Sequence, residues 1–369
     1  MTAPWPRPEE TATAADLLLG DARLIERPLT LHASGCELSI RSNSQALLDH
    51  LANYFAHLPM TPSQQRLEII VVERPVPDTG LPFIDWHREP GKHGRKDAYL
   101  DLTDGRLLLK VRTGMLFLQS EKQLIAAGPC LANDNQVINF INSQLMNHLQ
   151  QNGWLICHAA ALGKENHAIA LAGFSGNGKS TLMLHLMEKP DYRYLTNDRL
   201  FLRQSHPLPW TVGIPKLPRI NPGTLIGNPR LHALLHPDRR KILEQLPQHE
   251  LWALEEKHDV DIATLYGKDR INTSTPLPLR SLLILNWRLG SDEPLLLQRI
   301  DLTQRMDLLP AIMKTPGPFF HNRAGRFQRD DDVLPERDYT QILSRVAVFE
   351  VSGGIDFKAL VNLLNDEDL

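Results

Sequence analysis

The chain lacks three features that would each place it in a special class of protein. Its three cysteines, Cys36, Cys130 and Cys157, are widely spaced and odd in number, so we expect buried thiols rather than a disulfide framework. No apolar run approaches the length needed to span a bilayer. The formal net charge of −3 over 369 residues gives no general electrostatic attraction to nucleic acid or to an anionic membrane. We therefore expect neither nucleic acid nor a membrane among its partners.

Motifs for zinc binding and for export are also missing. There is no CxxC pair and no HExxH sequence, so nothing indicates a structural or catalytic zinc site. The first ten residues have neither a basic start nor a hydrophobic segment, which is not the pattern of a secretory signal. The hydrophobic fraction of 42% and the charged fraction of 22% are ordinary for a globular protein, which we expect to be cytoplasmic.

The chain does contain a complete phosphate-binding loop of the pattern G-x-x-x-x-G-K-[ST]. Its residues are Gly173, Phe174, Ser175, Gly176, Asn177, Gly178, Lys179 and Ser180, with Thr181 extending it. Glycines let the backbone curl so that successive N–H groups point at phosphate oxygens. In this pattern Lys179 reaches the β- and γ-phosphates of a nucleoside triphosphate, and the Ser180 hydroxyl binds Mg²⁺. The four fixed positions coincide by chance about once in a hundred chains of this length.

The residues on either side of the loop support this interpretation. Residues 167–172 form a short, almost wholly apolar run, which is typical of a buried strand. After the loop, a leucine- and methionine-rich segment predicts a helix that Pro190 ends. Strand, glycine loop and helix are the context that the motif requires, because they place the phosphates at the positive N-terminus of a helix. The sequence therefore predicts a site for a nucleoside triphosphate.

The spacing of apolar residues predicts an α/β protein with a smaller α+β domain at its N-terminus. We expect a flexible arm over residues 1–20, the α+β domain over 21–130 and an α/β domain with a mixed sheet over 131–369. In the first domain the pattern predicts strands within 28–41, a helix near 45–58, a strand at 67–72, a loop at 75–94 and a meander over 97–127. In the second it predicts helices near 135–150, 304–313 and 357–364, and strands at 154–162, 192–195, 200–202, 282–287 and 346–351.

A few residues outside the loop could take part in its chemistry. Asp198 follows a short predicted strand, so it should lie at the sheet edge where ligands collect, although Asn197 and Asp198 could also be a plain turn. His158 is the one histidine of an apolar strand, and such a residue is more often a core histidine than a catalyst. Lys216 and Arg219 lie on a proline-studded segment that could present cations to phosphate, or could simply be solvated.

Together these elements resemble the catalytic domain of HPr kinase/phosphorylase and its relatives. The likeness rests on the strand with His158, the loop 173–180 and its helix, and the sequence 196–199. More narrowly, the chain resembles the HPr kinase-related proteins of the subgroup called HPr kinase-related kinase B. The likeness covers roughly residues 135–369. It implies a P-loop, HPr kinase-like fold there, and ATP-dependent transfer of a phosphoryl group to a hydroxyl, which in the true enzymes belongs to a serine of a small carrier protein.

The resemblance also implies roles for individual residues. Residues 173–181 match the loop that binds ATP. His158 matches the histidine on the strand before it, and with Lys179 and Asp198 it makes up the expected catalytic set. Asn197 and Asp198 match a pair of acidic residues that binds metal and acts as base toward the acceptor hydroxyl. The expected ligands of Mg²⁺ are therefore Ser180 and Asp198.

Two departures from the family pattern leave alternatives open. Asn197 stands at the first acidic position, and an amide does not usefully accept a proton at neutral pH. Either Asp198 carries both duties, or another carboxylate serves, or transfer is weak. Residues 213–223 sit about where the family recognises its acceptor protein, but their sequence differs, so the carrier-protein substrate is not expected to apply.

The sequence thus predicts an ATP- and Mg²⁺-dependent kinase with an unidentified acceptor, either a protein or a small molecule. The rival hypothesis is a nucleotide-binding regulatory or scaffold protein with little or no transfer activity, and Asn197 is the residue that favours it. The N-terminal domain could recognise the acceptor or mediate assembly, for instance into a homo-oligomer, and its position in the chain is the only basis for either role.

Overall fold

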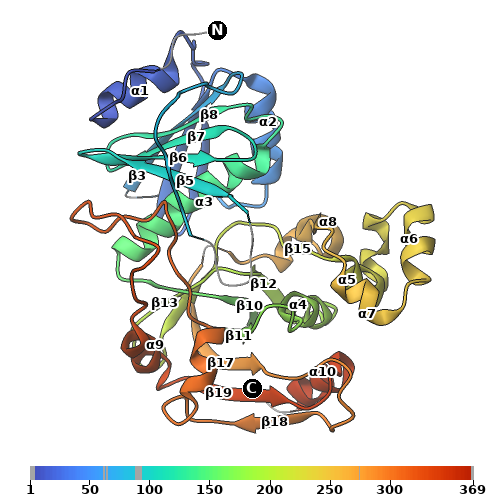
Figure 1. The fold of residues 1–369 in the computed structure, drawn as a ribbon. Coiled ribbons are helices and arrows are strands. Elements are labelled where there is room, and N and C mark those ends of the chain that lie inside the picture. The colour runs from blue at the N-terminus through green and yellow to red at the C-terminus, as the bar shows by residue number, and fades with distance from the viewer. Residues whose placement is uncertain (1–4, 61–62, 64, 88–93, 274, 367–369) are drawn as a thin grey trace. The chain divides into compact units, whose positions relative to one another are not determined.

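The computed structural model describes residues 5–60, 63, 65–87, 94–273 and 275–366. The chain divides into two compact units (Figure 1). The first unit consists of Met1–Asn152 and Pro316–Val333, and the second of Gly153–Thr315 and Leu334–Leu369. Both combine helices with sheets of mixed direction, which confirms the predicted α/β class.

An eight-stranded sheet forms the centre of the first unit, in the order β1-β2-β3-β8-β7-β6-β5-β4. The strands are β1 (Leu29–Ala33), β2 (Cys36–Ser42), β3 (Gln65–Glu73), β4 (Ile84–Asp85), β5 (Asp97–Asp101), β6 (Gly105–Lys110), β7 (Met115–Ser120) and β8 (Leu124–Gly128). β3 pairs in parallel with β2 and β8, and the other neighbours are antiparallel. The predicted strands over 28–41 and 67–72 and the meander over 97–127 are therefore confirmed. The short β4 lies in the segment expected to be a loop, of which residues 88–93 lie outside the described part.

Helices cover both faces of this sheet (Figure 1). On one face, α1 (Thr11–Leu19) buries Ala14, Ala15 and Leu18 against apolar residues of the central strands. On the other face, α2 (Gln45–Tyr54) and α3 (Asp134–Gln151) pack in a second core. The hydroxyl of Ser44 caps α2 by accepting a hydrogen bond from the Leu47 amide at 3.3 Å. The expectation of a flexible arm over 1–20 is thus wrong for residues 11–19. They form a helix because three small or apolar residues on one of its faces pack against the sheet.

The contacts of α3 place it differently from the sequence-based boundary near residue 130. Its apolar face, which includes Ile138, Ile141 and Leu145, is buried in the core of the first unit. Residues 316–333 also join this unit: Phe319 packs on Phe117 with ring centroids 5.5 Å apart. The apolar repeat of a helix shows which of its faces is buried but not which sheet that face packs against. The first unit therefore extends to Asn152, beyond the predicted boundary, and it also includes residues 316–333.

The second unit is built on a nine-stranded sheet arrangement. Its strands are β9 (Leu155–Cys157), β10 (Ala159–Lys164), β11 (His167–Gly173), β12 (Tyr192–Thr196), β13 (Leu200–Arg203), β14 (Trp210–Val212), β17 (Leu277–Leu285), β18 (Leu296–Arg299) and β19 (Ala347–Ser352). The main run is β12-β10-β11-β17-β19-β18, and β9-β13-β14 attach to the start of β17. β17 is parallel to both β11 and β19. It begins earlier than the predicted strand at 282–287.

Two cores lie on opposite faces of the main sheet. Leu171 and Leu283 face a core with α4 (Lys179–Met187) and α10 (Phe357–Asp366). Their neighbours along the strands, such as Ala170 and Leu282, face a core with α9 (Glu336–Leu343). Residues 304–313, expected to be an α-helix, form the 3-10 helix η3 (Met306–Ala311), since Pro310 cannot donate the hydrogen bond that an α-helix needs.

A largely helical insert links β14 to β17 and extends away from the sheet in Figure 1. Its elements are β15 (Arg219–Ile220), α5 (Pro222–Gly227), η1 (Pro229–Leu234), α6 (Pro237–Glu244), α7 (Gln248–Ala253), β16 (His258–Asp259), α8 (Ile262–Tyr266) and η2 (Lys268–Arg270). The pairing of β15 with β16 joins the two ends of the part that contains α5, η1, α6 and α7, and α8 and η2 follow β16.

The cysteines and the lengths of the helices bear on two expectations from composition. Cys36, Cys130 and Cys157 are all free and buried, as expected, and burial raises the pKa of each thiol. Within the described part of the chain, no helix has both the length and the apolarity to cross a bilayer.

Candidate functional site

Strand direction brings the predicted site residues to one edge of the second unit's sheet. β10 runs antiparallel to both β11 and β12, so the ends of β11 and β12 and the start of β10 share that edge. The end of β11 leads into the loop 173–180, the end of β12 leads into residues 196–199, and His158 directly precedes β10. His158 was expected in the middle of a strand, but it lies at the break between β9 and β10, where its amide donates to the Ile312 carbonyl at 2.7 Å.

The loop 173–180 is held in a curled conformation by glycines and by the end of β17. Gly176 and Gly178 have φ of +85° and +76°, a region that residues with a Cβ adopt only at a cost. The Asn177 side chain donates to the Leu285 carbonyl at 2.8 Å, and the Trp287 indole donates to the Asn177 carbonyl at 2.9 Å. Asn177 therefore fixes the loop rather than lining the cavity.

α4 begins directly after the loop, at Lys179. The first N–H groups of a helix have no partner within it, so the backbone here presents donors and a partial positive charge. The Lys179 ammonium donates to the Gly173 carbonyl at 2.7 Å, which holds the side chain over the loop. Burial lowers the pKa of Lys179 to about 8, with Asp198 acting in the opposite direction and Lys314 in the same direction. An anionic ligand would therefore stabilise the charged form of Lys179.

A tight turn positions the carboxylate that faces the loop. The Thr196 hydroxyl donates to the Arg199 carbonyl at 2.9 Å and closes residues 196–199 into a turn between β12 and β13. Asn197 and Asp198 are thus in a turn between strands and also line a cavity, so the turn does not exclude a role in the site, and that role stays a prediction. The Asn197 Oδ1 atom is buried and has no hydrogen-bond partner among the described residues.

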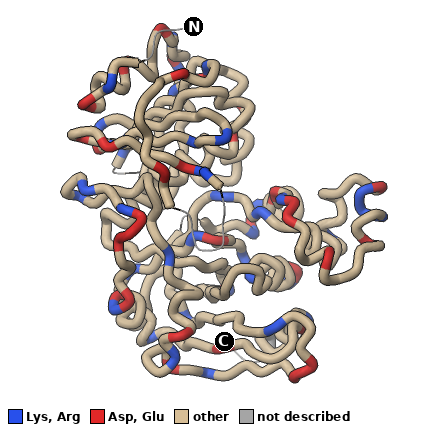
Figure 2. Tube along the Cα trace, in the orientation of Figure 1, with Lys and Arg blue, Asp and Glu red and all other residues tan. Residues whose placement is uncertain are grey.

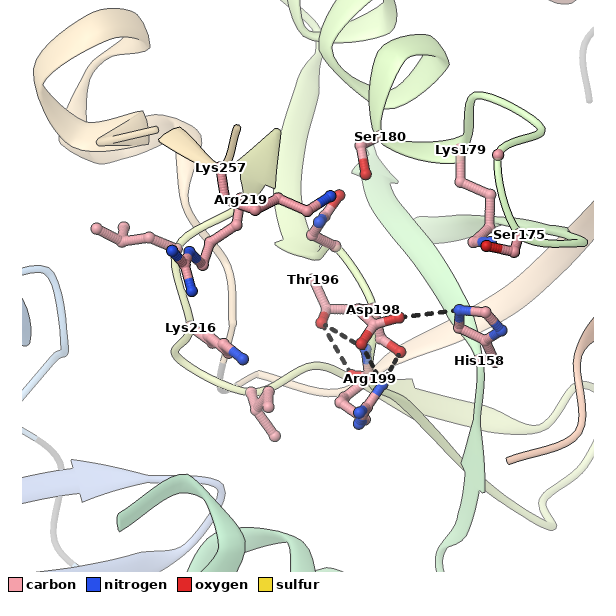
Figure 3. Close-up of a pocket in the computed structure, with 14 residues that line it drawn as sticks. His158, Ser175, Lys179, Ser180, Thr196, Asp198, Arg199, Lys216, Arg219 and Lys257 are labelled. Atoms are coloured by element: carbon pink, nitrogen blue, oxygen red, sulfur yellow. Dashed lines mark hydrogen bonds and ion pairs between the residues drawn. The ribbon is translucent and has the colours of Figure 1, made fainter. Parts of the chain in front are cut away.

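Asp198 is held by a histidine and an arginine (Figure 3). Its Oδ1 lies 3.0 Å from Nε2 of His158, and its Oδ2 is ion-paired with Arg199. Burial alone would raise the pKa of Asp198, but Arg199, His158 and Lys314 outweigh burial and hold the pKa well below its usual range. Asp198 is therefore ionised at neutral pH and is a weak base.

These side chains line a cavity of about 300 Å³, at the lower end of the size range for small-molecule sites. Its lining is strongly cationic: it includes Lys179, Arg199, Lys216, Arg219 and Lys257, against a single carboxylate, that of Asp198. Charges of both signs are interspersed along the rest of the second unit (Figure 2). The cavity thus concentrates positive charge in a chain whose net charge is −3, which suits a polyanionic ligand.

The structure brings most of the predicted site residues into this cavity, but not all. His158, Ser175, Gly176, Lys179, Ser180 and Asp198 line it. Gly173, Phe174, Asn177, Gly178 and Thr181 do not. Thr181 is buried, and its hydroxyl lies 2.7 Å from that of Thr224, so its side chain is part of the packing of α4 on the insert.

The oxygen atoms near the loop suit a magnesium ion that keeps water and phosphate ligands. Among the described residues there is no cluster of three His, Cys, Asp or Glu that could hold a metal by itself. The cavity is lined by Ser180 and Asp198, which carry a hydroxyl and a carboxylate, and by Asn197, whose Oδ1 atom is buried without a partner among the described residues. Mg²⁺ usually takes one or two protein oxygens and completes its shell with water and phosphate oxygens, so this set fits it.

Sequence reasoning missed several residues of the site. Arg199 was passed over although it adjoins Asp198, and Thr196 although it closes the turn. Lys257 directly precedes β16, and the pairing of β15 with β16 brings this part of the insert back to the cavity. Lys314 acts on the charges of both Lys179 and Asp198. Arg199 could have been found from its place next to Asp198, since a carboxylate is often paired with an adjacent cation. No pattern in the sequence links Lys257 or Lys314 to the site.

Comparisons with known proteins give only a weak likeness to solved structures. No family model matches the chain, and no curated protein matches it. Among solved structures, the Hpr(Ser) kinase/phosphatase from Coxiella burnetii is similar with a TM-score of 0.28 and 11% sequence identity. That match covers 57% of this chain and 88% of the other. At this distance no residue role carries over, so any function has to be argued from the cavity itself.

Proposed function

We propose that the second unit is an ATP- and Mg²⁺-dependent kinase that transfers the γ-phosphate to a hydroxyl. The observation that carries this proposal is the cationic cavity in which Lys179 and Ser180 of a complete phosphate-binding loop face Asp198. A nucleoside triphosphate supplies the negative charge that the cavity lacks. The helix N-terminus and the loop amides are pre-arranged for its phosphates.

Each residue has a task that its position allows. Lys179 would neutralise charge on the β- and γ-phosphates, since its ammonium is already held over the loop. Ser180 and Asp198, with the Asn197 carbonyl as a further oxygen, would hold Mg²⁺, which offsets charge between the phosphates when bound. Asp198 would also orient the acceptor hydroxyl, and His158 keeps its carboxylate in place.

The lowered pKa of Asp198 makes it a poor general base. Phosphoryl transfer depends mostly on positioning and on electrostatic stabilisation, so a weak base is compatible with turnover. For the same reason Asn197 need not abolish activity: protein kinases hold their metal ions with one aspartate and one asparagine. The buried Asn197 Oδ1 without a partner favours a ligand role, because leaving such an atom unsatisfied costs about 1–3 kcal/mol.

The direct test is transfer of label from γ-labelled ATP. The purified protein is incubated with Mg²⁺ and a lysate of its own cells, and label is sought on protein and in the small-molecule fraction. We expect labelled product with the wild type and none with Lys179→Ala. Lys241→Ala, which changes an exposed lysine of α6, is the matched control and should behave as wild type. Unchanged transfer in Lys179→Ala would refute the proposal.

The second candidate is a nucleotide-binding regulatory or scaffold protein, and the amide at Asn197 is the observation that favours it. If the missing carboxylate has silenced the site, wild type will bind ATP tightly and label nothing, while Asn197→Asp will gain transfer. If the kinase proposal is right, wild type transfers phosphate and Asn197→Asp does not create the activity.

A further inference from the structure

The cavity holds more positive charge than a nucleotide at the loop accounts for. Lys179 belongs to the loop, and Arg199 is paired with Asp198. Arg219 is paired with Asp259, with Nε and Oδ1 3.0 Å apart. Lys216 differs from these: among the described residues, its ammonium has no hydrogen-bond or ion-pair partner, although it lines the cavity.

Lys216 lies in an electrostatically costly place. Burial is the main cause that lowers its pKa to about 8; Arg199 and Arg219 lower it further, while Asp198 and Asp259 act in the opposite direction. A half-buried ammonium without a carboxylate partner is destabilising unless a ligand completes it. The structure therefore keeps a cation at a position where, among the described residues, it has neither a hydrogen-bond acceptor nor an ion-pair partner.

The backbone around Lys216 is held rigidly. The Tyr194 hydroxyl donates to the Lys216 carbonyl at 2.6 Å, and the Lys216 amide donates to the Ile214 carbonyl at 2.8 Å. Pro215 and Pro218 restrict the chain on both sides. Rigid placement means that little conformational entropy is lost when a ligand binds, which is characteristic of a built site.

The position of Lys216 indicates which ligand it meets. In Figure 3, Lys179 and Ser175 lie on one side of Asp198 and Lys216 lies on the other. An acceptor hydroxyl attacks the γ-phosphate in line, so the body of the acceptor extends away from the loop. With its hydroxyl at Asp198, the acceptor continues toward Lys216 and Arg219.

We propose that the acceptor is a small hydroxy compound with its own anionic group, a carboxylate or a phosphate, and that Lys216 binds this group with support from Arg219. This inference rests on the proposed kinase function and names the substrate class of the same site. The attacking hydroxyl forms the new O–P bond, ADP leaves with the electron pair of the broken bond, and the hydroxyl proton is released to water or phosphate. Lys216 is an acceptor-binding residue in this account and takes no part in the bond changes.

The test separates the anion site from the nucleotide site. The protein is saturated with Mg²⁺ and a non-hydrolysable ATP analogue, then titrated by calorimetry with inorganic phosphate, glycerate or glycerol. We expect phosphate or glycerate to bind at least about tenfold more tightly than neutral glycerol. Comparing phosphate with glycerate tells a phosphate group from a carboxylate.

Variants then assign the effect to Lys216. Lys216→Gln should weaken binding of the anionic probe about tenfold or more, the loss expected for a hydrogen bond to a charged group, while the affinity for the ATP analogue stays unchanged. Lys216→Arg keeps the charge and should retain most of the affinity. Lys241→Gln, at an exposed position of α6 that does not line the cavity, should change it less than about threefold.

Two different failures are distinguishable. If the analogue binds but anionic probes bind no better than glycerol, or equally well to Lys216→Gln, the anionic acceptor is refuted and the kinase proposal stands. If the analogue itself does not bind, the proposed function fails, and the inference fails with it.

Discussion

The two left-handed glycines of the loop give a prediction in which structural and functional effects separate. A Cβ at Gly178 would lie 2.7 Å from Cζ of the Phe357 ring, whereas a Cβ at Gly176 would meet nothing within 4 Å. Both positions have positive φ, so alanine costs about 1–2 kcal/mol of backbone strain at either one. At Gly178 the ring must also move by roughly 1 Å from an ordinary carbon contact, and overpacking of this kind costs about 1–3 kcal/mol.

Gly178→Ala should therefore lower the free energy of unfolding by about 2–5 kcal/mol, and Gly176→Ala by about 1–2 kcal/mol. The assay is urea denaturation followed by far-UV circular dichroism, with m-values compared to confirm a common unfolded state. Phe357→Leu added to Gly178→Ala provides the control: the smaller side chain should remove the part of the cost that comes from the clash and leave the part that comes from the backbone.

Nucleotide affinity should follow the opposite order. Gly176 lines the cavity, so a methyl group there would meet the phosphates of the proposed nucleotide, while Gly178 faces Phe357 instead. We expect Gly176→Ala to weaken binding of the ATP analogue more than Gly178→Ala does, although it costs less stability. Equal costs of unfolding for the two variants would refute the contact between the loop and α10, and equal nucleotide affinities would refute the assignment of Gly176 to the phosphates.

Three further predictions concern the same site. The pKa of Lys179 in the free protein is about 8 and an anionic ligand favours the charged form, so the ATP affinity should be flat below pH 8 and fall above it, with proton uptake seen by calorimetry in two buffers. Lys179→Arg should remove the part of this pH dependence that belongs to residue 179. An ATP affinity that rises with pH would contradict this prediction. His158→Gln should lower kcat about tenfold with little change in KM for ATP, because it loosens Asp198 and leaves the loop intact; a change in KM alone would assign His158 to nucleotide binding. Nucleotide binding should change tryptophan emission, and Trp287→Phe should remove most of that change, because this indole donates to the loop at Asn177; an undiminished signal would place the reporter elsewhere.

Local patterns in the sequence were enough to predict most elements and half of the site. The loop and its strand and helix follow from a contiguous motif. The turn at Asn197 and Asp198 follows from the rule that polar residues after a strand collect at one sheet edge. That rule holds here because β10 is antiparallel to both β11 and β12, which returns β12 to the direction of β11.

Long-range contacts set the limit. The break at His158 arises because β9 pairs with β13 while β10 pairs with β11 and β12, and no apolar pattern signals such a change of partner. The cations Lys257 and Lys314 reach the site from segments far away in the chain. The position of α3 in the first unit is also a long-range effect. Its sequence shows that one face of the helix is apolar, but not which of the two sheets that face packs against.

The central claim is that Lys179 and its loop deliver a γ-phosphate, and the most direct measurement is turnover of γ-labelled ATP at saturating Mg²⁺. We predict labelled product with the wild type and wild-type rates with Lys241→Ala. Lys179→Ala should lose at least about 100-fold, as expected for the removal of one group that stabilises developing charge. Circular dichroism should show the same fold in all three proteins. Equal labelling by wild type and Lys179→Ala would contradict the account.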